Sequence, residues 1–141
     1  MKLLYKLTSG LLSFFTIAGT TLVSATINPP IAKAAGSPEV VINELMWTGS
    51  TVSIADEWIE LRNNTDQVID LAGWQLTNSA TSGGALTIPA GTIAARGFFL
   101  ISNFAENSAS SILDVVPDLV TSAISLNNTC APIELLKPGE D

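Results

Sequence analysis

Apolar and polar positions alternate in short runs along most of the chain after residue 39. In segment 57–62, Ile59 and Leu61 fall on one face and their polar or charged neighbours fall on the other. A period of two residues is typical of a β-strand with one buried face, so Ile59 and Leu61 are predicted to face a core. Similar runs predict strands at 40–45, 57–62, 68–71, 74–76, 86–88, 98–101, 122–126 and 133–136.

Turn residues separate these runs. Residues 63–66 read Asn-Asn-Thr-Asp and predict a turn, because Asn and Asp tolerate left-handed backbone conformations. The polar, Gly-containing segment 78–84 is predicted to be a loop, and Pro117 limits 114–118 to an edge strand or a loop. Short strands at this spacing, with no helical period after residue 35, are typical of an all-β sandwich or barrel.

The N-terminal segment has the pattern of an export signal. Lys2 and Lys6 precede an apolar run over 7–23 that contains no charge. Small-residue sites follow at 23–25 and 32–34. A basic start, an apolar run and a small-residue site are the three parts of a secretory signal peptide.

Cleavage after Ala34 is the interpretation that we favour. It makes 1–34 a signal peptide, 35–39 a linker and 40–141 the folded domain, which is then extracytoplasmic, either secreted or associated with the cell envelope. No membrane insertion is expected after cleavage. The alternative is an uncleaved anchor, because 7–23 is close to the shortest apolar run that spans a bilayer.

The charge balance of the domain narrows its partners. The chain has 6 basic and 13 acidic residues, and the segment after residue 34 keeps all the acids but only Arg62, Arg96 and Lys137. Nucleic acids and anionic membranes are bound through Lys and Arg, so both are unfavourable partners. An acidic surface favours cationic partners or divalent ions.

The residue types exclude several kinds of chemistry. The chain contains no His and one Cys. Ser-His and Cys-His nucleophilic systems are therefore absent, as are most zinc sites, and we predict that the protein is not an enzyme. No disulfide within the chain can form. Cys130 is interpreted as a small buried apolar residue, with an intermolecular bridge or a reactive thiol as the alternatives.

Calcium is the one metal that the sequence leaves as a candidate. Asp56, Asn64, Asp66 and Asp70 offer oxygen ligands that would converge if their turns met at one end of a sandwich. These residues do not form a D-x-D-x-D loop. The alternative, that they lie on solvated strand faces and cap turns, is favoured, so no cofactor is expected.

Three tryptophans are candidates for a binding surface. Trp74 shares its strand face with Leu76, which predicts a core position. Trp58 shares its face with charged residues, so it is the surface candidate, although a core position is an equal alternative. Trp47 precedes a Gly-Ser turn, and its sequence context does not distinguish the two positions.

Seven short segments occur in a characteristic order. They are 41–44 (VINE), 57–63 (EWIELRN), 69–76 (IDLAGWQL), 88–92 (IPAGT), 97–101 (GFFLI), 125–128 (SLNN) and 133–136 (IELL). This ordered set, over about 40–137, resembles the lamin-tail domain family in its bacterial, exported form. The resemblance implies an immunoglobulin-like β-sandwich without a catalytic centre. In nuclear lamins this domain contacts proteins and DNA, whereas bacterial relatives often accompany hydrolase domains and have an inferred attachment role.

The sequence departs from the family pattern in two places. Family members often have a Gly-containing turn where this chain has 129–132 (TCAP). The final residues 138–141 (PGED) resemble the first half of a hairpin turn. We therefore expect a fragment of a longer protein that lacks an edge strand, in which an unpaired segment 133–136 would cause dimerisation or aggregation.

These observations favour a noncatalytic attachment or recognition module for a protein or a cell-envelope component. One alternative is a carbohydrate-binding ancillary domain of a larger secreted hydrolase. The other alternative is a structural spacer. The sequence does not determine the ligand or the oligomeric state.

Overall fold

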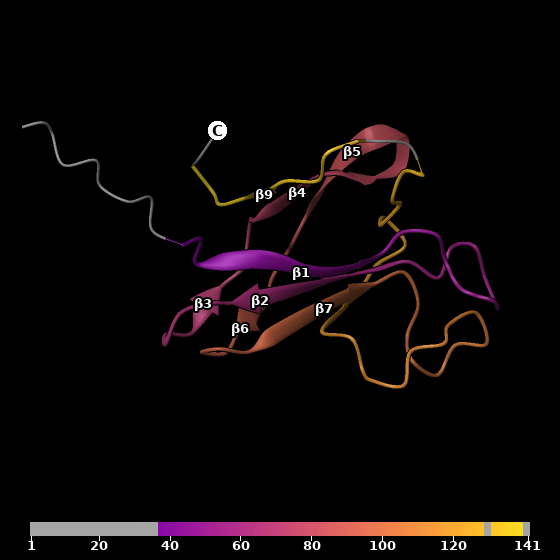
Figure 1. Ribbon diagram of the computed structural model, residues 1–141, viewed down its shortest axis with the longest axis horizontal. Helices are drawn as coiled ribbons and strands as arrows, with labels where there is room; N and C mark the ends of the chain where they lie inside the picture. The colour runs from indigo at the N-terminus through magenta and orange to yellow at the C-terminus, as the bar shows by residue number, and fades with distance from the viewer. Residues whose placement is uncertain (1–36, 129–130, 140–141) are drawn as a thin grey trace, which may run out of the picture. The chain divides into compact units, whose positions relative to one another are not determined.

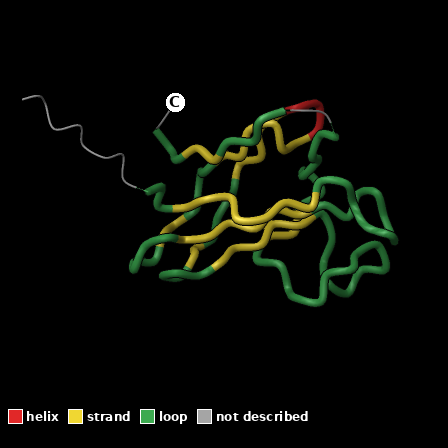
Figure 2. Tube along the Cα trace, in the orientation of Figure 1, coloured by secondary structure: helices red, strands yellow, loops and turns green. Residues whose placement is uncertain are grey.

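The computed structural model describes residues 37–128 and 131–139, and the regular secondary structure of this part of the chain is almost entirely β, with long loops between the strands (Figures 1 and 2). One short 3-10 turn, η1 (Thr81–Gly83), interrupts the strands. The strands are β1 (Val40–Met46), β2 (Trp58–Asn63), β3 (Ile69–Asp70), β4 (Gln75–Ala80), β5 (Gly84–Thr87), β6 (Thr92–Ile93), β7 (Phe98–Ser102), β8 (Leu119–Val120) and β9 (Leu135–Leu136).

Two sheets form the layers of an immunoglobulin-like β-sandwich. One sheet has the strand order β1-β2-β7-β8, and the other has the order β5-β4-β9. In Figure 1 the second sheet lies above the first, and the short β3–β6 pair lies near one end of β2. The strands pair antiparallel except β7 and β8, which are parallel. The predicted fold class is confirmed.

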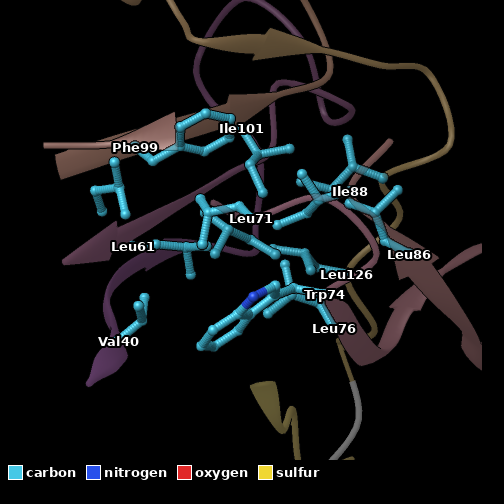
Figure 3. Packing of buried hydrophobic residues seen from close by; sticks show 13 residues of the cluster. Val40, Leu61, Leu71, Trp74, Leu76, Leu86, Ile88, Phe99, Ile101 and Leu126 are labelled. Atoms are coloured by element: carbon cyan, nitrogen blue, oxygen red, sulfur yellow. The ribbon is translucent and has the colours of Figure 1, made fainter. Parts of the chain in front are cut away.

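The core lies between these sheets (Figure 3). Ile59 and Leu61 of β2 are completely buried, as the alternation of their strand predicts. Phe99 and Ile101 are their register partners on β7 and belong to the same core cluster. Trp74 is also buried, which confirms its predicted core position. Because apolar burial is the dominant favourable term in folding, these two central strands anchor the domain.

The predicted loop at 78–84 is wrong at both ends, because β4 continues to Ala80 and β5 begins at Gly84. Ser79 is fully buried, and its hydroxyl donates a hydrogen bond to the carbonyl of Leu76 at 2.8 Å. The extension of β4 has backbone partners on both sides, because Ala80 pairs with Gly84 of β5 and the N–H of Ser125 donates to the Ser79 carbonyl at 2.9 Å. Those tertiary hydrogen bonds, which are invisible in the local sequence, outweigh the weak strand preference of the polar residues.

The predicted strand at 122–126 does not form. The segment makes one isolated bridge, between Ala80 and Ile124. Ile124 and Leu126 nevertheless point into the core, being 1% and 4% exposed. The predicted direction of these side chains is therefore confirmed. The extended ladder is replaced by a turn-rich path that contacts β4 through this bridge and through the N–H of Ser125, which donates to the Ser79 carbonyl at 2.9 Å.

The last predicted strand is paired rather than left without a partner. Leu135 and Leu136 of β9 pair antiparallel with β4, and the backbone N–H of Thr77 donates to the carbonyl of Glu134 at 2.9 Å. In the sheet order β9 is an outer strand. One side of the segment 133–136 is therefore hydrogen-bonded within the domain.

Some predictions lie outside the described residues. They concern the signal peptide at 1–34 and the environment of Cys130. Among the residues that the structure does describe, no helix is long and apolar enough to cross a membrane.

Candidate functional site

Two acidic side chains are buried where the chain enters β2. Asp56 is 1% exposed and Glu57 is 7% exposed. Asp56 Oδ2 accepts a hydrogen bond from the backbone N–H of Ile112 at 2.9 Å, and Glu57 Oε2 accepts one from the N–H of Leu126 at 2.9 Å. The N–H of Asn103 donates to the Glu57 carbonyl at 3.0 Å. The two acids therefore fix segments that follow β7 against the start of β2.

Burial has a different consequence for each of these two acids. Desolvation raises the pKa of the Glu57 carboxyl above its ordinary value of 4.5, and the hydrogen bond from Leu126 lowers it in part. Asp56 Oδ1 is buried without a hydrogen-bond partner among the described residues. An unsatisfied buried oxygen costs free energy. These acids thus hold the loops at the expense of some stability.

The β1–β2 loop is compact because its own polar groups are hydrogen-bonded. The N–H of Ser50 donates to the Ser53 carbonyl at 2.8 Å, and the N–H of Asp56 donates to the same carbonyl at 3.2 Å. Gly49 has a φ of +68°, and a Cβ at this position would collide with the backbone of Ile54. A glycine is therefore required at position 49, where the backbone approaches Ile54 within the loop.

The segment between β7 and β8 is a series of small turns. The N–H of Ser108 donates to the carbonyl of Ala105 at 3.0 Å, and the N–H of Ser111 donates to the carbonyl of Ser108 at 3.1 Å. The Ser111 hydroxyl then accepts the N–H of Leu113 at 3.1 Å. Serine hydroxyls commonly stabilise turns in this way. The turns present Ile112 beside Asp56.

Both segments lie at the same end of the sandwich, at the right of Figure 1, and the hydrogen bond between Asp56 and Ile112 joins them. Apolar side chains are exposed here: Trp47 by 48%, Val52 by 52%, Ile54 by 88% and Ile112 by 52%. We call these four residues the loop-end surface. Exposed apolar patches with a polar rim are typical of interaction sites.

Trp58, the predicted surface aromatic, is only half-buried and lies inside a sheet. Its register partners are Met46 on β1 and Ser102 on β7. Trp47, just beyond the end of β1, is the more exposed aromatic. Sequence reasoning missed Ile54 and its neighbours in the loop-end surface. The available signal was the pair of large apolar residues, Val52 and Ile54, among the small and polar residues of 50–56.

The calcium candidates are not brought together. Asp56 precedes β2, whereas Asn64, Asp66 and Asp70 follow it, and a six-residue strand spans roughly 20 Å. Within the described residues, no group of three or more metal-binding side chains is found. The favoured alternative of solvated acids is wrong for Asp56, which is buried because loop packing, rather than solvent, surrounds it.

The other candidates have local roles at the far end of β2. Asp66 accepts a hydrogen bond from Arg96 Nε at 2.7 Å, and this pair lowers the pKa of the Asp66 carboxyl. Asn64 Nδ2 donates to the carbonyl of Pro38 at 3.3 Å. Asp70 Oδ1 accepts the N–H of Ala72 at 2.9 Å. Each interaction stabilises a turn or an exposed pair.

Asn63 organises that far end. It is fully buried, and its Nδ2 donates to the carbonyls of Gln67 at 2.6 Å and Ala94 at 3.0 Å. Its Oδ1 accepts the N–H of Thr65 at 2.8 Å. One neutral amide thereby joins the turn after β2 to the turn before β7. The predicted turn at 63–66 is confirmed in position, but β2 runs through Asn63 and the bend itself covers 65–67.

The positive charges of the domain gather at the Asn63 end. Arg62 lies over the ring of Phe98 at 5.6 Å, and Arg96 pairs with Asp66. Lys137 Nζ pairs with Glu39 at 2.9 Å, directly before β1. The β1–β2 loop and the segment between β7 and β8, which build the opposite end, contain no Lys or Arg. The loop-end surface therefore lies in an acidic region.

Comparison with known proteins identifies the family of this domain. Residues 33–138 match the family model described as Lamin Tail Domain. The chain belongs to the lamin-tail domain family. No curated protein matches it. The family is noncatalytic and immunoglobulin-like, which fits a binding or structural module.

This lamin-tail domain also has a hollow of about 320 Å³ beside η1. The described residues that line it carry no ionisable side chain, so among them nothing offers acid–base chemistry. They are Ala80, Ser82, Gly83, Ser125, Leu126, Asn127 and Asn128. The buried acids instead bind backbone amides of the domain, which is a structural role.

Proposed function

We propose that this lamin-tail domain is a noncatalytic, exported attachment or recognition module, and that its loop-end surface binds a protein or a cell-envelope component. The observation that carries the proposal is the set of exposed apolar side chains, led by Ile54 at 88% exposure, on two hydrogen-bonded loops. Their position on two loops that the Asp56–Ile112 hydrogen bond joins gives the domain a candidate face for contact.

Preorganisation favours this surface as a binding site. The serine turns and the Asp56–Ile112 hydrogen bond already fix the loops in the free domain. A partner therefore does not have to order them, which removes part of the entropic cost of association. Trp47 supplies the type of large aromatic side chain that dominates binding energy at many interfaces.

The export part of the proposal rests on the sequence of 1–34, with its basic start, apolar run and small-residue site. The noncatalytic part is supported by Asp56 and Glu57, whose oxygens are used in binding loop amides. The absence of His from the sequence supports the same conclusion, because the usual general base at neutral pH is missing.

Site-specific photo-crosslinking tests the proposed function. A photoreactive amino acid replaces Ile54 in the full chain, produced in the source organism, and a matched chain carries it at Val68. Val68 is a suitable control because it is 66% exposed at the Asn63 end of the domain. Mass spectrometry then identifies each adduct. We expect a specific protein adduct at position 54 only.

Other results would change the assignment. Identical adducts at both positions, or no adduct at position 54, would contradict a recognition role for the loop-end surface. An adduct with envelope polysaccharide would favour the carbohydrate-binding alternative. A chain without adducts that still separates neighbouring domains of a longer protein would favour the spacer alternative.

A further inference from the structure

We infer that the loop-end surface takes a cationic, apolar segment of a polypeptide, such as a short stretch in which Lys or Arg flanks two or three apolar side chains. This inference rests on the proposed function and specifies the chemistry of the partner. It follows from the coincidence of exposed apolar side chains and one-sided charge at the same end of the sandwich.

The positive charges of the domain are not spread evenly along β2. Arg62, Arg96 and Lys137 lie at the Asn63 end, and each has a partner there in Phe98, Asp66 or Glu39. A cation at the loop-end surface would therefore meet no neighbouring Lys or Arg from residues 35–61 or 97–136.

We call Glu106 and Asp114, which lie with Ile112 on the segment between β7 and β8, the acidic border. Asp114 is exposed and Glu106 is half-buried, and neither forms an ion pair with another described residue. Their potential is therefore not cancelled locally. Clustered charges of one sign steer and hold partners of the opposite sign, most strongly at low salt.

The apolar part of the surface selects against a purely ionic partner. Trp47, Val52 and Ile54 expose about half or more of their area, and water is released when such surface is covered. The same acidic border repels phosphate backbones and anionic headgroups. A polypeptide segment with both Lys or Arg and apolar side chains satisfies both halves of the surface.

Three synthetic peptides of equal length test the inference with the full chain. The first alternates Lys with Leu, the second replaces Leu with Ser, and the third replaces Lys with Glu. Calorimetric titration measures each Kd. We expect binding of the Lys-Leu peptide only, with affinity that falls as salt is raised, because the interaction needs both components.

Two single substitutions then locate the site. Ile54→Ser is expected to raise the Kd for the Lys-Leu peptide about tenfold, because the wild-type isoleucine side chain becomes buried on binding. Val68→Ser, the matched change at the other end, is expected to leave the Kd unchanged. Both residues are exposed, so unchanged thermal melting verifies the fold of each variant.

A charge-matched pair of double variants tests the acidic border. Glu106→Gln with Asp114→Asn is expected to weaken binding and to flatten its salt dependence. Asp66→Asn with Asp70→Asn removes the same net charge at the Asn63 end and is expected to change neither quantity. Equal effects in the two variants would show that net charge alone attracts the peptide, which would overturn the inference.

Three further results would overturn it: equal binding of the Lys-Ser peptide, equal binding of the Glu-Leu peptide, or an unchanged Kd in Ile54→Ser. Insertion into phosphatidylcholine vesicles in place of peptide binding would identify a membrane surface instead. These failures differ from failure of the proposed function. A specific protein adduct at position 54 would persist if only the partner chemistry were wrong, and would be absent if the recognition role itself were wrong.

Discussion

At each end of β2, buried polar side chains hold distant turns together, but the two ends use different chemical groups. At the Asn63 end, one neutral amide donates to the Gln67 and Ala94 carbonyls and accepts from Thr65. At the loop end, two carboxylates bind one backbone amide each, and Asp56 Oδ1 has no hydrogen-bond partner among the described residues. Both ends join distant turns, but only the second does so with desolvated charge.

This difference predicts that the two ends of β2 contribute unequally to stability. A satisfied neutral amide carries a small desolvation cost, whereas a buried carboxylate carries a large one. The loop end also exposes Trp47, Val52, Ile54 and Ile112, which reduces the apolar burial that could stabilise it. Binding surfaces on loops are commonly supported by a rigid scaffold in this way.

The largest expected effect comes from breaking the Asn63 end. Asn63→Ala removes the donor to three carbonyls and the acceptor for the Thr65 N–H, at a fully buried position. We expect the free energy of unfolding to fall by about 3 kcal/mol, because buried polar groups lose their partners. Urea unfolding measures the change. A loss comparable to that of an exposed substitution would contradict the organising role of Asn63.

Gly49→Ala is expected to have the next largest effect, at the loop end. The positive φ and the collision with the Ile54 backbone together force the loop to rearrange, at a cost of about 1–3 kcal/mol. Binding of the Lys-Leu peptide should be lost at the same time. Gly139→Ala is the control, because Gly139 has a φ of +84° but nothing lies within 4 Å of an added Cβ. If Gly49→Ala still binds the peptide, recognition does not depend on the shape of this loop.

Glu57→Gln is expected to change how the free energy of unfolding depends on pH. The raised pKa of Glu57 means that the folded state holds this proton more tightly than the unfolded state. The associated stability is complete below the ordinary value of 4.5 and is lost as pH rises through the folded pKa. Wild type minus variant stability should therefore decrease with rising pH in that window, as measured by urea unfolding in a pH series. An opposite slope would show that the hydrogen bond from Leu126 outweighs burial.

Asp66→Asn is expected to have the smallest effect. The Asp66 side chain is 79% exposed and solvent screens its pair with Arg96, so thermal melting at neutral pH should change little. The sign with pH is opposite to that of Glu57. The lowered pKa means that the contribution is present above the ordinary value of 3.8 and is lost as pH falls through the folded pKa. A large destabilisation at neutral pH would show that the Asn63 end depends on charge.

Much of the fold could be predicted because it depends on local alternation. Ile59 and Leu61 were placed in the core by a period of two residues, and Trp74 by its shared face with Leu76. The candidate site could be predicted only in part. Trp58 was selected for its charged neighbours, but its position between β1 and β7 half-buries it, and Ile54 in the adjacent loop is the more exposed residue.

By itself, the sequence determined the sandwich class, the inward faces of its main strands and the acidic charge with few cations, because these depend on composition and on nearest neighbours. Tertiary structure alone decided that β4 runs through polar residues to Ala80, that Asp56 and Glu57 are buried, and that the cations gather at the end opposite the loop-end surface. The physical reason is that hydrogen-bond partners and solvent exposure are set by segments distant in sequence. Ile112 lies 56 residues from Asp56 and Leu126 lies 69 residues from Glu57, and only folding brings each pair within 2.9 Å.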